Sequence, residues 1–169
     1  MMHNNNSIPN HPPTLEITII SAQDLTRRGR PSLAFCGRLR PFITLTAAKM
    51  YKTRVDERGG VNPTWGEKFE ISLDHAFFYQ GIYLQLHTKR LLMGQTQLGW
   101  CLVPASDIVS RLAPVGSTQF LSYRLRDRDG SRGRGIVNVA VRLQGSVYHY
   151  PSRPLISDDE SVIGIPVKL

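Results

Sequence analysis

Two stretches of this chain concentrate side chains that bind anions. Residues 26–41 carry five arginines, residues 88–96 carry one lysine and one arginine, and neither stretch contains an aspartate or a glutamate. Guanidinium and ammonium groups of this kind are suited to phosphate and carboxylate ligands. Three consecutive apolar residues in the second stretch could also enter a lipid surface. The candidate residues are Arg27, Arg28, Arg30, Arg38, Arg40, Lys89, Arg90, Leu91, Leu92 and Met93.

A second basic group lies between these two stretches. It comprises Lys49, Lys52, Arg54 and Arg58. Because side chains alternate between the faces of a strand, Lys52 and Arg54 are expected to share a face. Two interpretations stay open for both groups. The cations either contact an anionic surface or only keep a surface soluble, and Leu91–Met93 either inserts into lipid or packs into the core.

Residues suited to catalysis or metal binding show no productive spacing. The five histidines, at positions 3, 11, 75, 87 and 149, do not follow the spacing of a zinc site. No serine lies in a nucleophile elbow. Asp127, Asp129 and Ser131 resemble the start of a calcium-binding EF-hand loop, but the glycine and the distal glutamate of that loop are missing. The sequence therefore predicts no catalytic residue, no metal ligand and no cofactor.

Charge alone leaves several partners open. The formal net charge is +8, and the basic residues belong to the middle of the chain, since residues 144–169 carry two cations against three acids. Such a charge favours phospholipid, nucleic acid or acidic protein partners. Residues 124–135 are rich in arginine and glycine and are similar to an RNA-binding segment, but they lack the aromatic side chains on which bases stack. A hairpin turn is the favoured interpretation of this segment.

The stretch from Val61 to Leu73 predicts a central strand. Asn62-Pro63 indicates a turn, because proline restricts its own backbone and that of the preceding residue. From Trp65 onward, apolar and polar residues alternate, which is typical of a strand with one buried face. Glu67 lies on the apolar face, and we expect it to be paired or at the rim.

Similar patterns predict a sheet protein. A helix is expected within residues 104–112 and a loop at 74–81. Eight short strands between turn signals indicate an all-β fold, an eight-stranded antiparallel β-sandwich with Greek-key connections. We expect an unstructured segment at 1–13, one domain at 14–143 and a flexible tail at 144–169. The expected strands are 15–20, 42–46, 50–55, 65–73, 82–87, 98–103, 119–126 and 135–143.

Several of these motifs together resemble the C2 domain family. They are the strand start 15–25, Pro41-Phe42-Ile43, Lys52-Thr53-Arg54, Asn62-Pro63-Thr64-Trp65-Gly66-Glu67-Lys68-Phe69 and Leu98-Gly99. Residues 120–127 and 135–139 are similar, more narrowly, to the small plant C2 proteins that associate with the BONZAI copines. That resemblance implies a cytoplasmic or membrane-peripheral regulator of plant defence and cell death, with a copine-type or other signalling protein as partner.

The resemblance also bears on calcium. In C2 domains that bind calcium, aspartates of the first and third loops at one end of the sandwich supply the oxygen ligands. The corresponding loops here are residues 26–41 and 88–96, which hold seven cations and no carboxylate. Calcium requires several carboxylate or carbonyl oxygens, so calcium-independent contact is expected. Many C2 domains bind phosphoinositides on a concave sheet face, which the resemblance assigns to Lys49, Lys52, Arg54 and Arg58.

The combined expectation is a calcium-independent module that binds anionic phospholipids and a protein partner. No secretory signal, myristoylation site or membrane-spanning run is present in the sequence, which suggests a cytoplasmic protein at the membrane periphery. Two cysteines fit free thiols in a reducing compartment. The alternatives are a protein–protein adaptor without lipid binding, an enzyme, or a nucleic-acid binder. The lipid, the partner and the oligomeric state stay open.

Overall fold

The computed structural model describes residues 13–25, 39–58, 60–90, 94–109 and 116–144, which form eight strands and two short helices. Neighbouring strands pair in the order β3-β2-β5-β6-β7-β8-β1-β4, and each pair is antiparallel. The elements are β1 (Thr14–Gln23), β2 (Pro41–Thr46), β3 (Met50–Lys52), β4 (Thr64–Ser72), α1 (His75–Gln80), β5 (Ile82–Lys89), β6 (Gln95–Val103), α2 (Ala105–Ile108), β7 (Thr118–Arg126) and β8 (Arg132–Gln144).

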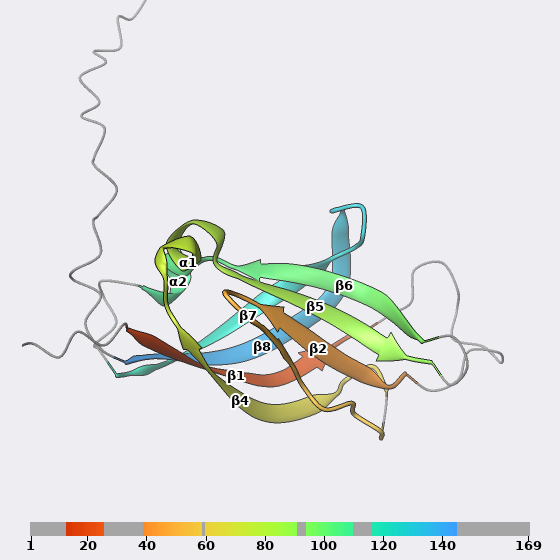
Figure 1. Cartoon of the computed structure of the whole chain (residues 1–169). Helices are drawn as coiled ribbons and strands as arrows, with labels where there is room; N and C mark the ends of the chain where they lie inside the picture. Colours follow the sequence, from red (N-terminus) through yellow and green to blue (C-terminus); the bar gives the residue numbers. More distant parts are fainter. Residues whose placement is uncertain (1–12, 26–38, 59, 91–93, 110–115, 145–169) are drawn as a thin grey trace, which may run out of the picture.

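The strands fold into two facing layers (Figure 1). One layer contains β3, β2, β5 and β6, and the other contains β7, β8, β1 and β4. Between the layers, β6 and β7 pair only at Trp100 and Arg126. The all-β antiparallel sandwich expected from the sequence is therefore confirmed.

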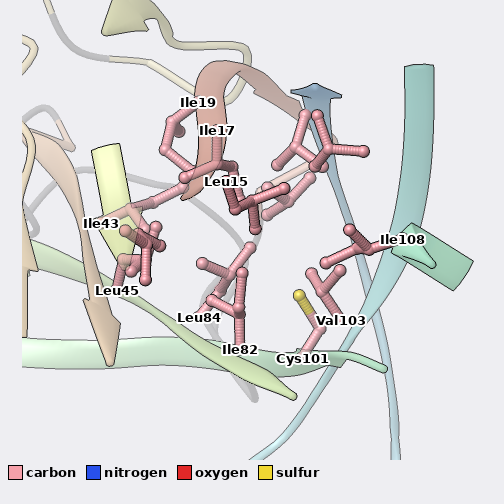
Figure 2. Close-up of a cluster of buried hydrophobic side chains, with 14 of the residues drawn as sticks. Leu15, Ile17, Ile19, Ile43, Leu45, Ile82, Leu84, Cys101, Val103 and Ile108 are labelled. Atoms are coloured by element: carbon pink, nitrogen blue, oxygen red, sulfur yellow. The ribbon is translucent and has the colours of Figure 1, made fainter. Parts of the chain in front are cut away.

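Alternating apolar side chains from both layers fill the space between them. Leu15, Ile17 and Ile19 of β1 are fully buried, and the cluster includes Leu84 of β5 and Val103 of β6 (Figure 2). Removing such side chains from water is the dominant favourable term in folding. This core fixes which side chains of each strand must point outward.

The motif Asn62-Pro63 joins β4 to the end of β1. The Asp24 amide donates to Asn62 Oδ1 over 3.0 Å, and the Ala22 amide donates to the Pro63 carbonyl over 3.0 Å. Glu67 is paired, as expected from its position on the apolar face. Its Oε1 accepts from the Arg54 amide at 2.8 Å and lies 3.3 Å from Arg54 Nε.

Of three local expectations, two were wrong and the helix within residues 104–112 was confirmed. Strand β3 ends at Lys52 rather than at residue 55, because the hydroxyl of Thr53 accepts the Ile43 N–H that a backbone carbonyl would otherwise take. Residues 75–80 form helix α1 instead of a loop, since Asp74 caps the Phe77 amide and Phe77 is buried. Helix α2 lies in the expected range, but its N-cap is Pro104, without a side-chain cap.

The connection between β5 and β6 is also shorter than the expected loop at 88–96. Strand β5 continues to Lys89 and β6 begins at Gln95, because the sheet ladder extends to the pair Lys89–Gln95.

No helix in the described part of the chain has the length and apolar character needed to cross a membrane. The domain boundaries expected from the sequence stay predictions.

Candidate functional site

The described residues of the two basic stretches approach each other at one end of the sandwich, where Arg40 lies beside Thr88 and Lys89. Strands β2 and β5 meet there, with the Lys89 amide 2.9 Å from the Arg40 carbonyl and the Arg40 amide 3.0 Å from Thr88 Oγ1. Arg90 follows β5 directly. The other candidates of this group lie outside the described residues: Arg27, Arg28, Arg30, Arg38, Leu91, Leu92 and Met93.

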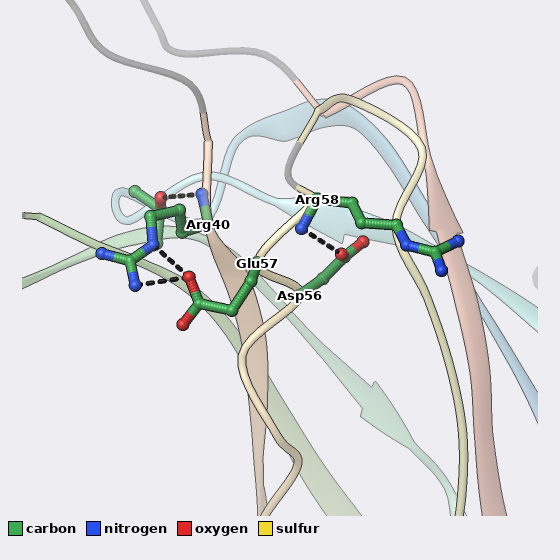
Figure 3. A network of polar contacts seen from close by, with 5 residues as sticks. Arg40, Asp56, Glu57 and Arg58 are labelled. Atoms are coloured by element: carbon green, nitrogen blue, oxygen red, sulfur yellow. Dashed lines mark hydrogen bonds and ion pairs between the residues drawn. The ribbon is translucent and has the colours of Figure 1, made fainter.

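Arg40 is already paired at this end. Its guanidinium contacts Glu57, with Nε 2.6 Å from Oε2 (Figure 3). The neighbouring carboxylate of Asp56 accepts the Arg58 amide at 3.0 Å. Each acid of this loop thus has a local partner, and among the described residues no three potential metal ligands gather in one place.

The second group includes a residue on the outer face of β3-β2-β5-β6. The strand register places Lys52 opposite Thr44, Thr44 opposite Gln85, and Gln85 opposite Trp100. Directly opposed residues of antiparallel strands share a face. A row of polar side chains and one tryptophan therefore crosses this layer, and Arg126 of β7 continues it beyond Trp100.

Lys52 belongs to a compact cluster on this face. Its Nζ lies 4.0 Å from the centre of the Phe42 ring. Phe42 stacks on His87, with ring centres 5.3 Å apart and planes inclined by 16°. His87 Nε2 lies 3.1 Å from Thr44 Oγ1. The cation is thus held above an aromatic ring, as in cation–π contacts, and the imidazole is held by a hydroxyl.

The surroundings of His87 are positive. Burial lowers the pKa of His87 below its usual value, and the charges of Lys52 and Arg128 lower it further. Its Nδ1 is buried and has no hydrogen-bond partner within the described part of the chain. The positive charges of Lys52 and Arg128 thus act on this part of the outer face, which favours an anionic ligand.

The other residues of the second group lie apart from this cluster. Lys49, Arg54 and Arg58 are exposed. Arg54 extends toward Glu67 of β4, and its side chain remains 82% exposed. Of the four predicted cations, Lys52 is thus the one held by aromatic side chains. Lys89 is also exposed.

Sequence reasoning missed the aromatic part of the site. Phe42, His87 and Trp100 occupy outward positions of their strands, where polar residues are the rule. The sequence did contain a signal. Strand alternation places apolar groups inside, yet the outward positions of residues 42–46 and 82–87 hold the large rings of Phe42 and His87. Leu39, which precedes Arg40 at this end of the sandwich, packs against the core.

The sandwich and its basic outer face define a C2-type module. A model of the C2 domain family matches residues 13–120, and the chain belongs to this family. The chain is also similar to BON1-associated protein 2 of Arabidopsis thaliana, with 30% identity over 132 residues. That match covers 78% of this chain and 61% of the relative's length.

Solved structures show the same fold. A C2 domain of plant Extended Synaptotagmin 1 superposes with a TM-score of 0.61 at 16% identity, over 80% of this chain and 98% of that domain. A C2 domain-containing protein from a putative elicitor-responsive gene has a TM-score of 0.57 at 20% identity, over 84% of this chain and 96% of its own. Identities this low show the fold alone.

Proposed function

We propose that this C2 domain binds anionic phospholipid headgroups on the outer face of β3-β2-β5-β6, without calcium. The observation that carries the proposal is the cluster of Lys52, Phe42 and His87. The ring fixes the position of the ammonium, so less conformational freedom is lost when a phosphate binds.

The charges around the cluster support an anionic ligand. Lys52 and Arg128 both act on His87, and the exposed Lys49, Arg54 and Arg58 add positive charge to the surface away from the cluster. A basic residue near an anionic membrane contributes about 1 kcal/mol to binding. Several such residues would give reversible binding, which fits a peripheral protein at the cytoplasmic face of a membrane.

Calcium independence is supported by the loop end of the sandwich. Arg40 lies there with its charge paired to Glu57. Asp56 accepts a backbone amide of its own loop. A divalent cation would have to displace both contacts and approach the cations Lys89 and Arg90, which costs electrostatic energy.

The loop residues named from the sequence extend this proposal. A second contact with the bilayer would come from these loops. Its salt-dependent part is supplied by five arginines, Lys89 and Arg90. Its apolar part is supplied by Leu91, Leu92 and Met93. The arginines are Arg27, Arg28, Arg30, Arg38 and Arg40.

A protein partner forms the second part of the proposal. A copine-type partner is favoured by the relative's name, BON1-associated protein 2, and by the likeness of residues 120–127 and 135–139 to that plant group. The same likeness favours a non-enzymatic role in the regulation of defence and cell death. Because the match covers 61% of that relative, these assignments are proposals for this chain.

A protein adaptor without lipid binding is the second candidate, favoured by Phe120, which is 76% exposed on β7.

Sedimentation of the full chain with vesicles tests the lipid part. We expect binding to vesicles that contain phosphatidylserine and phosphatidylinositol bisphosphate, and none to pure phosphatidylcholine. Binding should be equal in calcium and in chelator. Binding that appears only in calcium would refute calcium independence, and no binding to either vesicle would leave the adaptor as the function.

A further inference from the structure

The hairpin formed by β7 and β8 presents four arginines toward solvent. Arg124 and Arg126 on β7 and Arg132 and Arg134 on β8 are all exposed, whereas their neighbours Leu125, Gly133 and Gly135 are buried. The segment that the sequence indicated as a hairpin is therefore also a ribbon with its cations on one side. We call these four residues the arginine ribbon.

The glycines explain why the arginines face outward. A Cβ on Gly133 would lie 2.8 Å from the Leu125 carbonyl oxygen, and a Cβ on Gly135 would lie 2.7 Å from Leu125 Cδ1. Both distances are too short for a side chain. A larger residue at Gly133 would push β8 away from β7, and one at Gly135 would displace the buried side chains of Leu125 and Leu25. The alternation of arginine and glycine at residues 132–135 thus has a packing cause.

The guanidinium groups are partly fixed along the ribbon. Arg124 Nη1 donates to the Arg134 carbonyl over 3.3 Å, and Arg126 Nη1 donates to the Gly130 carbonyl over 3.1 Å. Arg126 lies directly opposite Arg132. Each guanidinium has five N–H donors, so most of the donors of Arg124 and Arg126 remain available to a ligand.

No carboxylate within the described part of the chain forms an ion pair with any of these four arginines. Like charges placed directly opposite each other across two strands destabilise the pair. The fold therefore keeps a cation pair, Arg126 and Arg132, at some energetic cost. A ligand with several negative charges would remove that cost.

The tip of the hairpin is rigidly connected to the neighbouring layer. Trp100 Nε1 of β6 donates to the Asp127 carbonyl over 2.9 Å. In the turn, Asp129 Oδ1 accepts from the amide and the hydroxyl of Ser131, at 3.0 and 2.6 Å. This anchoring holds the ribbon in one position, which lowers the entropic cost of binding.

We propose that the arginine ribbon is a second anion site, separate from the Lys52 cluster, and that it binds several phosphates carried close together on one small scaffold. An inositol polyphosphate has this chemistry, either free or as the headgroup of a phosphoinositide lipid. Arginine forms bidentate contacts with phosphate, and the opposed pair Arg126 and Arg132 supplies two such groups to one ligand.

Nucleic acid fits the ribbon less well. Single-stranded binders add aromatic side chains on which bases stack. The nearest exposed aromatic on this face of β7 is Phe120, four residues from Arg124, which is about 13 Å along a strand. Trp100 lies opposite Arg126, but its indole is half-buried and its Nε1 already donates to the Asp127 carbonyl.

The test is a calorimetric titration of the full chain with inositol hexakisphosphate. It uses a chain with Lys52→Gln, which weakens the first site, as the reference. Three variants are made in that background: R126Q/R132Q, R126K/R132K and R142Q. Arg142 is an exposed arginine of the same strand and serves as the matched control. All variants should have the same melting temperature as the reference, because exposed charges contribute little to stability.

We expect R126Q/R132Q to bind at least about tenfold more weakly than the reference, a loss of one charge-assisted contact or more. R126K/R132K should fall between the two, and R142Q should bind like the reference. Equal binding by R126Q/R132Q and R142Q would overturn the proposal. So would equal binding by R126K/R132K and the reference, because recognition would then need charge without the guanidinium geometry.

Two further arms identify the source of the phosphates. Vesicles with phosphatidylinositol bisphosphate replace the free ligand in the first arm. A loss in both measurements supports recognition of a lipid headgroup, and a loss with the free ligand alone supports a free polyphosphate. In the second arm, tighter binding of a single-stranded RNA than of inositol hexakisphosphate, abolished by R126Q/R132Q, would overturn the proposal in favour of nucleic acid. The Lys52 cluster is tested separately, so either site can fail without the other.

Discussion

The ammonium of Lys52 lies 4.0 Å from the centre of the Phe42 ring, on the outer face of the sandwich. Phe42 itself is 1% exposed, although its ring lies outside the core between the layers. The ring is instead covered on its own face by Lys52 and His87. A buried ring beneath an exposed cation thus positions that cation for a ligand.

Replacing Phe42 by leucine tests this relationship. The variant keeps an apolar residue at the site but removes the ring beneath Lys52 and beside His87. We expect a loss of about 1–2 kcal/mol in the free energy of unfolding, from the lost volume and the lost cation–π contact. Vesicle binding should fall a fewfold. Unchanged stability and unchanged binding in urea unfolding and sedimentation assays would show that the ring does not support Lys52.

His87 should make the stability depend on pH. Its pKa is lowered in the folded state by burial, Lys52 and Arg128, so below about pH 6.5 the unfolded chain binds a proton that the folded chain does not. The contribution of His87 to the free energy of unfolding is fully present above about pH 6.5. It is lost as the pH falls through the lowered pKa of His87 in the folded state. Urea unfolding at several pH values measures the loss. His87→Gln should flatten the curve in that window, and an equal slope in both proteins would contradict this assignment.

The hairpin glycines give a packing prediction. Gly135→Ala would place a Cβ 2.7 Å from Leu125 Cδ1 and 3.0 Å from Leu25 Cδ2. Overpacking of this kind costs about 1–3 kcal/mol, which thermal unfolding would detect as a lower melting temperature. Arg142→Ala, at an exposed position of the same strand, is the control and should change stability little. Equal melting of both variants would mean that β8 can shift at no cost.

Much of the fold could be predicted from the sequence because it follows from local patterns. The alternation after Trp65 identified β4, and the position of Glu67 on its apolar face predicted a partner, which is Arg54. Helix α1 was missed because its signal is small: one capping residue, Asp74, and one buried ring, Phe77. Strand β3 ended early because a side-chain hydroxyl, that of Thr53, replaced a backbone acceptor.

The candidate site was predictable only in part, for a different reason. Basic residues can be read from the sequence, and Lys52 was among those named. The contacts of Lys52 with Phe42 and, through that ring, with His87 join three strands, and their register is set by the whole sheet. The alignment of Arg126 with Arg132 likewise depends on a register shift between β7 and β8. No local pattern contains that information.

Vesicle sedimentation of Lys52→Gln beside Lys68→Gln, both in chelator, tests the central claim most directly. Each variant removes one lysine charge, but Lys68 lies on β4 of the other layer, paired with Glu16 at 3.1 Å. If the Lys52 cluster binds the headgroup, Lys52→Gln should weaken binding about fivefold or more, as expected for about 1 kcal/mol per basic residue. Lys68→Gln should bind like the parent. Equal binding by both variants, or a greater loss with Lys68→Gln, would contradict the account.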